Sequence, residues 1–347
     1  MVKISVIVPT YNRLARLKRV LAGLEQQTYP LTQFEVVVVS DGASDGTNDY
    51  LQKLVNENRT PLNLRPVLQP NQGVAAARNN GIKHAQGDYV LFVDDDVVPE
   101  PQLIAEHLNW HDKYGADAVV LGPMLTPPQF NMHPWVLWEQ AMLEKQYQAM
   151  LAKEWDPTAR QFYTGNTSLA RYHIVEAGGF DASFRRAEDV ELAYRLSDRG
   201  LRFVFNYQAV GYHYAERSFP SWIAIPYAYG RNDVIFTYDK GQSWLLPTIW
   251  KEFHGRHGLV RGLTALCLDR PVLAKTAVFA LKQAAAIAHK FGQERLAGMA
   301  YSGIFNLRHY QGIADELGGR DLFYAGVAGK QVQPHNHVAQ QQLLATE

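Results

Sequence analysis

Strand-like and helix-like segments alternate along the first 115 residues, and this alternation limits the fold more than any other feature of the sequence. Short apolar or β-branched runs cover residues 4–8, 34–39, 64–68 and 88–93, and stretches with helical spacing follow over 13–27, 47–58 and 74–85. Short runs that are apolar throughout are typical of strands buried on both faces. Strands joined by helices form right-handed βαβ units. We therefore predict an α/β domain whose mostly parallel sheet has helices on both faces, with Asn12 as the N-cap of the first helix.

The alternation becomes looser after about residue 115. We expect a strand in "ADAVVLGP", a helix over 133–153, an amphipathic helix in "AEDVELAYRLSDRG", two short strands in "LRFVFNYQAVGYHY" and mostly helices from about residue 218. A chain of 347 residues suggests about two domains. We predict an α/β domain over 1–215, a helical extension over 216–332 that serves as a lid, an acceptor platform or a packing element, and a disordered tail over 333–347.

Charge and cysteine content exclude several classes of protein. Lys and Arg together number 34, as do Asp and Glu, so no net charge attracts the chain to nucleic acid. Cys267 is the single cysteine, which excludes a disulfide within the chain and favours a reducing compartment. The first ten residues do not resemble a signal peptide, and no window of about 18 residues is apolar and uncharged. We expect a cytoplasmic protein, with peripheral contact at the inner face of a membrane as a second option for the Ala- and Leu-rich stretch 259–288.

Polar residues stand at the carboxyl end of each predicted strand in the first domain. These ends are Thr10-Tyr11-Asn12, Ser40-Asp41-Gly42, Gln69-Pro70-Asn71 and Asp94-Asp95-Asp96. In open parallel sheets ligands bind at the carboxyl ends of the strands. We expect these four segments to lie side by side and to form one binding site.

Three adjacent carboxylates repel one another unless a cation neutralises them. Mg²⁺ and Mn²⁺ prefer carboxylate oxygens and bind one or two protein carboxylates together with substrate phosphates. Asp94 and Asp96 are two residues apart, so both can reach one ligand from a turn. A metal-bound phosphate site is one interpretation of this cluster, and a solvated acidic loop is the other.

Two further segments favour the phosphate interpretation. Gly73 precedes a predicted helix whose free N–H groups favour anions, and Arg78 on that helix can donate a charge-assisted hydrogen bond. Asp41 stands at a strand end, where it can accept hydrogen bonds from a base or a ribose. The alternatives are an ordinary helix with a surface arginine and a plain turn rich in Asp and Gly.

Five ordered motifs give the chain a specific resemblance. "ISVIVPTYNR", "VVVVSDGASDGT", "NQGVAAARNNGI", "FVDDD" and "GGFDASFRRAEDVELAYRL" occur with the order and spacing of family 2 glycosyltransferases, which have the GT-A fold. The match covers about residues 3–215. The resemblance implies an inverting transfer of a sugar from a nucleotide-sugar donor, usually a UDP-sugar, with Mn²⁺ or Mg²⁺ as the cofactor.

The resemblance also implies roles for individual residues. Those implied to bind the nucleotide-sugar are Pro9, Thr10, Tyr11, Asn12, Asp41, Arg78, Asp94 and Asp95. Asp96 is implied to bind the metal that bridges the diphosphate, with Asp94 beside it. His213 resembles a third metal ligand found in several relatives, although a lone histidine is more often structural.

The pair Glu188-Asp189 begins the helix in "AEDVELAYRL". Acidic residues at a helix N-terminus are favoured by the dipole, by about 0.3–1 kcal/mol, so a purely structural role is sufficient to explain them. An inverting transfer, however, needs a base that takes the proton of the acceptor hydroxyl. By resemblance Asp189 is that base, and Glu188 binds acceptor hydroxyls or supports the site.

Two other functions compete with glycosyl transfer. A sugar-nucleotide pyrophosphorylase also has a nucleotide-binding sheet and acidic metal ligands, but "PTYNR" stands where its glycine- and lysine-bearing loop is expected. A non-catalytic sugar-nucleotide-binding module is the second alternative. The acceptor (a glycan, a lipid-linked sugar, a protein or a small molecule), the donor sugar and the oligomeric state are not indicated by the sequence.

Overall fold

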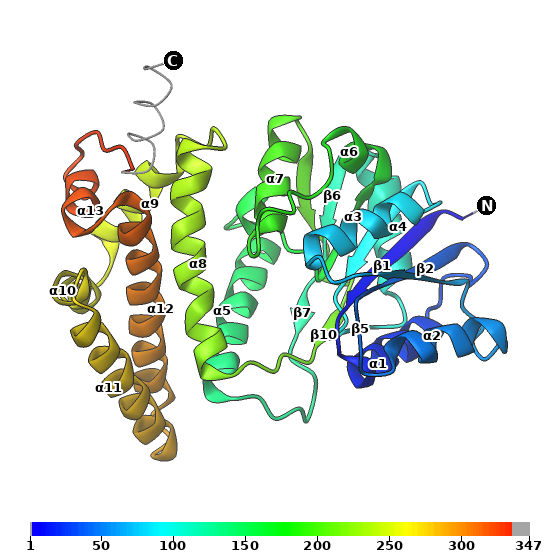
Figure 1. The fold of residues 1–347 in the computed structure, drawn as a ribbon, viewed down its shortest axis with the longest axis horizontal. Coiled ribbons are helices and arrows are strands. Elements are labelled where there is room, and N and C mark those ends of the chain that lie inside the picture. The colour runs from blue at the N-terminus through cyan, green and yellow to red at the C-terminus, as the bar shows by residue number, and fades with distance from the viewer. Residues whose placement is uncertain (1, 335–347) are drawn as a thin grey trace. The chain divides into compact units, whose positions relative to one another are not determined.

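The computed structural model describes residues 2–334 and divides into two compact units (Figure 1). The first unit consists of the chain up to Met132 and of Glu139–Glu216, and the second of His133–Trp138 and the chain from Arg217 onward. The first turn of the long helix that begins at Pro134 thus belongs to the second unit. The sequence did not indicate this division. Residues 335–347, most of the tail predicted to be disordered, lie outside the described residues.

Two sheets form the centre of the first unit. The larger has the strand order β3-β2-β1-β4-β8-β6-β9, and its strands are β1 (Ile4–Thr10), β2 (Phe34–Asp41), β3 (Leu64–Gln69), β4 (Tyr89–Val93), β6 (Ala118–Leu121), β8 (Asn166–Ala170) and β9 (Arg202–Phe205). Only β8 runs antiparallel to its neighbours, β4 and β6. The smaller sheet has the order β5-β10-β7, with β5 (Val97–Pro99), β7 (Met124–Leu125) and β10 (Gly211–His213).

Helices cover the sheet of the first unit and make up the second unit. In the first unit they are α1 (Leu14–Glu25), α2 (Thr47–Asn56), α3 (Val74–His84), α4 (Leu103–Tyr114), the 3₁₀ turn η1 (Ala159–Gln161), α6 (Arg171–Glu176) and α7 (Glu188–Asp198). α5 (Pro134–Leu151) spans the division between the units, and the second unit adds α8 (Phe219–Tyr238), α9 (Leu245–Gly255), α10 (Gly258–Cys267), α11 (Pro271–Lys290), α12 (Glu294–Leu317) and α13 (Arg320–Val327).

The period of two along β2 explains why the large sheet needs helices on both faces. Val36 and Val38 pack with residues of α1, α2 and α4, whereas Val37 and Val39 pack with Ala77 of α3. All four valines are fully buried. Burying an aliphatic side chain of this size contributes about 1.5–3 kcal/mol, so the run of four valines stabilises both helical layers at once.

The start of α1 differs from the prediction. Asn12 is not the N-cap: its backbone is left-handed, with a φ of 52°, and its Oδ1 accepts a hydrogen bond of 2.7 Å from the backbone N–H of Ser44. The first N–H of the helix, that of Leu14, instead donates to Asp45 at 2.9 Å. The cap therefore comes from the loop after β2, which a local sequence pattern could not reveal.

The second unit, called the helical unit below, has its own core. Trp222 of α8 is completely buried and packs edge-to-face on Trp138 and Tyr301, with ring centroids 5.8 Å apart in each pair. The backbones of α8 and α12 come very close, because Gly230 faces the carbonyl oxygen of His309 and Gly312 faces that of Tyr227. A Cβ atom at either glycine would overlap the opposing carbonyl.

We expect Gly230→Ala to destabilise the helical unit despite the higher helix propensity of alanine. The added methyl group must push α8 away from α12, and overpacking of this kind costs about 1–3 kcal/mol. Gly262→Ala in α10 is the matched control, because no atom lies within 4 Å of its Cβ position. Relief of the glycine entropy cost should stabilise that variant by about 0.5–1 kcal/mol. Thermal or urea unfolding of both variants measures the difference, and equal shifts would contradict the close approach.

Among the described helices, α11 is long and apolar enough to meet the criteria for crossing a membrane. Its most apolar window has a mean hydropathy of 1.2, and 11% of that window is buried inside the protein. Lys275 and Lys282 lie within this helix. By length and composition alone α11 could cross a membrane, although no window of about 18 residues in the sequence is both apolar and uncharged.

Candidate active site

The carboxyl ends of β1, β2 and β4 meet at one pocket of the first unit. The strands are neighbours in the sheet, and the pocket has a volume of about 330 Å³. Its lining residues are Pro9, Thr10, Tyr11, Arg13, Asp41, Asn71, Gly73, Val74, Ala77, Arg78, Asp94 and Asp95. Seven of the eight residues predicted to bind the nucleotide-sugar lie in this set. The eighth, Asn12, bonds to the loop at Ser44.

Asp41 organises one side of the pocket. Its carboxylate accepts hydrogen bonds from the side chain of Gln69 at 2.7 Å and from the backbone N–H groups of Gln72 and Gly73 at 2.8 and 2.9 Å. The segment between β3 and α3 is thereby fixed at the end of β2. A carboxylate has about four acceptor positions, so these three bonds leave room for one donor from a ligand.

Arg78 joins parts of the chain that are far apart in sequence. Its guanidinium donates to Glu188 at 2.7 Å and to Asp94 at 2.9 Å, which ties the start of α7 to the end of β4. Arg78 is only 4% exposed, so its interpretation as a surface arginine is wrong. Its Nε is buried without a hydrogen-bond partner among the described residues, so one donor of the guanidinium is left unsatisfied beside the two ion pairs.

Asp189 differs from the adjacent Glu188 in its surroundings. Glu188 is buried against Arg78, whereas Asp189 is partly exposed and accepts a hydrogen bond of 2.9 Å from the N–H of Val190 in its own helix. Although part of its surface is exposed, desolvation of the carboxyl group by the surrounding protein raises the pKa of Asp189 to about 7, with a further contribution from the charge of Glu188. A carboxyl group with a pKa near neutrality is suited to general-base catalysis.

Asp95 turns inward from the same strand end. It is 3% exposed, accepts from Thr10 Oγ1 at 2.8 Å and pairs with Arg13 Nη1 at 2.8 Å. Burial raises the pKa of Asp95 to about 6, although Arg13 opposes this effect. The side chain therefore links the ends of β1 and β4, and we expect it to hold the pocket wall in place.

Asp96 lies at the outer edge, where Oδ2 is 3.3 Å from both Arg13 and Arg16. Oδ1 faces Nε2 of the buried His213 on β10, 3.7 Å away, and Nδ1 of that histidine lies 3.2 Å from Gln140. Residues 2–334 contain no cluster of three or more His, Cys, Asp or Glu side chains that could hold a metal. One carboxylate and one imidazole nevertheless fit a cation that takes its remaining ligands from phosphates and water.

Sequence reasoning missed several residues at this site. Arg13 and Arg16 contact the triple aspartate, and Arg16 also pairs with Glu216 at 2.6 Å. Asn79 holds the "GGF" segment through two hydrogen bonds of 2.8 Å with the backbone of Phe180. A Cβ on Gly179 would lie 2.6 Å from Oδ1 of Asn79, which explains the glycine. Only Arg13 carried a sequence signal, because it directly follows the polar end of β1.

Comparison with known proteins finds glycosyltransferases among the relatives of this chain. Validoxylamine A glucosyltransferase from Streptomyces hygroscopicus subsp. jinggangensis (strain 5008) is 33% identical over 233 residues, which cover 60% of this chain and 54% of that protein. The chain thus spans about half the length of this relative.

Two solved structures share the fold. TarS 1-349 from Staphylococcus aureus, in complex with UDP-GlcNAc, has a TM-score of 0.55 at 18% identity and covers 86% of this chain and 90% of that one. The mannosyltransferase PcManGT from Pyrobaculum calidifontis, in complex with GDP-Man and Mn²⁺, has a TM-score of 0.57 at 19% identity, with coverages of 89% and 86%. The GT-A fold and the helical extension that we predicted are confirmed.

The family is indicated directly by a family model. The model described as glycosyl transferase family 2 matches residues 5–179, which include β1, the loop after β2, α3 and the triple aspartate. The pocket described above is built from those same segments. This chain belongs to glycosyl transferase family 2.

Proposed function

We propose that the chain is a metal-dependent, inverting glycosyltransferase that moves a sugar from a nucleotide-sugar, with a UDP-sugar as the expected donor, to an acceptor hydroxyl. The observation that carries the proposal is the Arg78 bridge, because it joins Asp94 in the pocket wall to Glu188, the first residue of the "ED" pair of α7. Asp189 follows Glu188 directly, so the proposed base lies next to a residue that is tied to the donor pocket. Family membership and glycosyltransferase relatives support the same activity.

The donor side follows from the pocket walls. Asp41 has an acceptor position left for an N–H of the nucleobase. Pro9, Thr10 and Tyr11, at the end of β1, form a wall for the nucleoside. Asp94, which is half-exposed, can accept from a ribose hydroxyl while Arg78 holds it. Gly73 at the start of α3 leaves backbone N–H groups near the phosphates.

The chemical step needs one bond made and one broken. The acceptor oxygen attacks C1 of the donor sugar from the face opposite the diphosphate, and the bond from C1 to the phosphate oxygen breaks with its electron pair on the leaving group. Asp189 takes the proton of the acceptor hydroxyl, which its pKa of about 7 allows near neutral pH. Attack from the opposite face inverts the configuration at C1.

Metal binding is assigned to Asp96 and His213, with Asp94 as a neighbouring carboxylate. The donor set of oxygen and imidazole nitrogen suits Mn²⁺ and is tolerated by Mg²⁺. A divalent cation held there supplies positive charge that stabilises the leaving diphosphate. Arg13 and Arg16 contact Asp96, so a bound metal would share this carboxylate with the two guanidinium groups.

A donor panel tests the proposal. We expect Mn²⁺ to stimulate release of the nucleoside diphosphate from one UDP- or GDP-sugar, and a suitable glycan or small-molecule hydroxyl to increase that release further. Formation of nucleoside triphosphate from a sugar nucleotide and pyrophosphate would support a pyrophosphorylase instead. Tight donor binding with no release across all acceptor classes would support a binding module without catalysis.

A further inference from the structure

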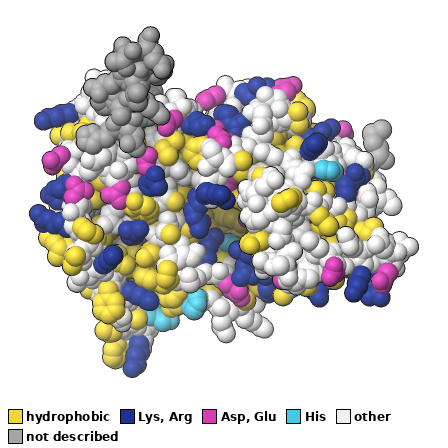
Figure 2. Space-filling view, in the orientation of Figure 1, with side chains coloured by type: hydrophobic (Ala, Val, Ile, Leu, Met, Phe, Trp, Pro, Cys, Tyr) yellow, Lys and Arg dark blue, Asp and Glu magenta, His cyan; other side chains and the backbone are white. Residues whose placement is uncertain are grey.

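The helical unit carries a surface that the proposed transferase reaction does not use. Of the 21 large hydrophobic side chains exposed in the described part of the chain, nine lie between residues 259 and 299, on α10, α11 and the start of α12. They are Leu259, Leu266, Val272, Leu273, Phe279, Ile287, Phe291, Leu296 and Met299. Figure 2 shows hydrophobic and basic side chains mixed over these helices. So dense an exposed apolar patch marks an interaction site.

The residues of α11 fall into three stripes. Ala274, Val278 and Ala285 are buried in the unit's core. Val272 and Phe279, 74% and 63% exposed, are seven residues apart and therefore share an outward stripe. Lys275 and Lys282 have the same spacing and form the border between the buried and exposed stripes. An apolar face edged by lysines is typical of helices that lie in a membrane interface.

The charges around this surface are predominantly positive. Between residues 257 and 300 the chain has six Lys and Arg, and only two acidic residues, Asp269 and Glu294. Both acids have partners: Asp269 accepts from the backbone N–H of Arg320 at 2.8 Å, and Glu294 contacts His289 at 2.8 Å. Lys275 and Lys282 form no ion pair with any of residues 2–334. The surface thus has the charge that an anionic lipid layer would attract.

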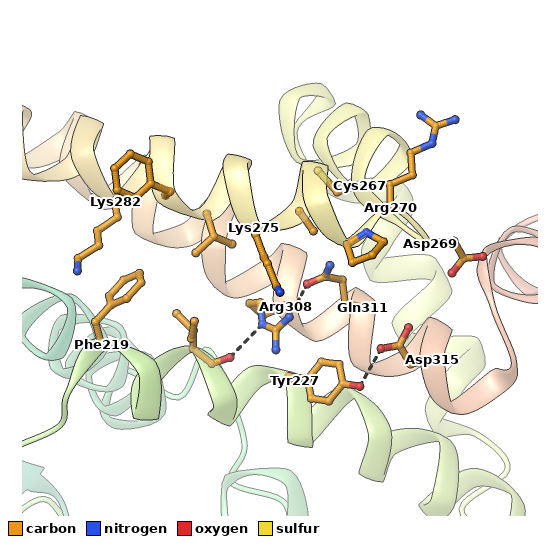
Figure 3. A pocket seen from close by; sticks show the side chains of 15 residues that line it. Phe219, Tyr227, Cys267, Asp269, Arg270, Lys275, Lys282, Arg308, Gln311 and Asp315 are labelled. Carbon is orange, nitrogen blue, oxygen red and sulfur yellow. Dashed lines mark hydrogen bonds between the residues drawn. The ribbon is translucent and has the colours of Figure 1, made fainter.

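A pocket of about 610 Å³ opens beside the lysine stripe, between α8, α11 and α12. Lys275, Lys282 and Arg308 line it together with apolar residues, and Figure 3 shows Lys275 and Arg308 directed into the same space. Asp269 and Asp315 also line the pocket, and Asp315 accepts a hydrogen bond of 2.7 Å from the hydroxyl of Tyr227. Arg308 lies 4.6 Å above the ring of Tyr227, and Lys282 lies 4.4 Å above that of Phe219. Cations above aromatic rings next to an apolar wall suit a phosphate attached to an aliphatic chain.

We propose that the helical unit binds the surface of an anionic phospholipid bilayer. The outward stripe of α11 and the exposed leucines of α10, Leu259 and Leu266, enter the boundary between headgroups and acyl chains. Lys275, Lys282 and Arg308 contact lipid phosphates. This activity goes beyond the proposed sugar transfer and does not depend on it.

Two other occupants fit the surface less well. If α11 crossed the bilayer, Ala274, Val278 and Ala285 would leave the core, and two lysines would enter hydrocarbon. If a second copy of the chain covered the patch through a two-fold axis, the basic borders of both copies would face each other and repel. An anionic bilayer satisfies the apolar stripe and the cations together.

Vesicle flotation with the full chain tests the proposal. We expect binding to phosphatidylcholine vesicles that contain phosphatidylglycerol, weak binding to pure phosphatidylcholine, and a loss of binding at high salt because surface charges are then screened. Lys275→Gln/Lys282→Gln should lower the partition coefficient by about 25-fold, since each cation near an anionic surface contributes roughly fivefold. Val272→Ser/Phe279→Ser should lower it by about tenfold or more.

Matched changes on α2 of the first unit provide the control. Lys53→Gln/Val55→Ser removes one exposed cation and one exposed apolar side chain there and should leave vesicle binding unchanged. Equal binding of all variants, or no preference for anionic vesicles, would overturn the proposal. A dimer in light scattering that Phe279→Ser dissociates, without vesicle binding, would assign the surface to a second copy. Binding of inorganic phosphate in calorimetry, without vesicle binding, would assign the pocket to a soluble anion and overturn the proposal.

Discussion

Asp189→Asn should reduce kcat by about 10²–10⁴-fold, the contribution typical of a general base, while the affinity for the donor stays nearly unchanged. The substitution keeps the shape and removes the basicity. Donor contacts are assigned to Asp41, Arg78 and the metal, so the loss should appear in turnover and not in occupancy. Single-turnover rates and calorimetric donor titration on one preparation measure both quantities.

The pH profile of the wild-type chain gives an independent test of the same carboxyl group. Asp189 must be deprotonated to accept a proton, and its pKa is raised to about 7. We therefore expect kcat/KM to rise with pH through about 7 and then to level off. The Asp189→Asn variant should lack this limb.

Stability separates the catalytic role from that of a helix cap. The pKa of Asp189 is higher in the folded chain than the ordinary value of 3.8, so the folded state favours the protonated group, and ionisation opposes folding more strongly as pH rises from about 4 to 7. Asp189→Asn should thus keep or raise the melting temperature at pH 8. Asp49→Asn, in the first turn of α2, is the control for loss of a favourable dipole interaction and should lower stability slightly. Normal turnover with lowered stability in Asp189→Asn would show that this residue is a cap, and Glu188 would become the candidate base.

Much of the first unit was predictable because its signals are local. The run Val36–Val39 in the middle of β2 is apolar and fully buried, and the helices begin and end within a few residues of the predicted bounds. The carboxyl ends of parallel strands must meet, so Thr10, Asp41 and Asp94 could be placed in one pocket from the sequence alone. Tertiary structure adds nothing to these inferences except distances.

The remaining features depend on contacts between distant segments. Asp45 caps α1 from another loop, Arg78 reaches Glu188 across 110 residues, and Arg16 reaches Glu216 across 200. No spacing rule predicts such pairs, because the partners are brought together only by the fold. Membrane contact of residues 259–288 was one option from the sequence, but the sequence does not tell which side of the Ala-rich helix α11 is packed and which side is exposed. The domain limits at 215 and 332 and the roles of the site residues stay predictions.

Asp96→Asn should abolish the effect of Mn²⁺ on donor affinity. Mutation of a residue that supports a metal ligand lowers metal affinity or activity by about 10–100-fold. Loss of a carboxylate that binds the metal directly should therefore lower metal affinity by at least the upper end of that range. UDP titrations with Mn²⁺ and with a chelator should give two different dissociation constants for the wild-type chain and a single value for the variant. Arg13 and Arg16 keep Asp95 and Glu216 as partners, so the fold should persist.

His213 and Glu216 distinguish metal binding from a general loss of structure at this edge. His213→Ala should raise the Mn²⁺ concentration for half-maximal activity, because Nε2 lies 3.7 Å from Asp96 and the ring is otherwise held by Gln140. Glu216→Gln breaks only the pair with Arg16, whose partner is 55% exposed and whose contribution is about 0–1 kcal/mol. Glu216→Gln should change neither the Mn²⁺ concentration for half-maximal activity nor the melting temperature. A lowered melting temperature in His213→Ala with an unchanged Mn²⁺ requirement would mean that the imidazole only fills the core, and Asp96 would then hold the metal together with the donor phosphates alone.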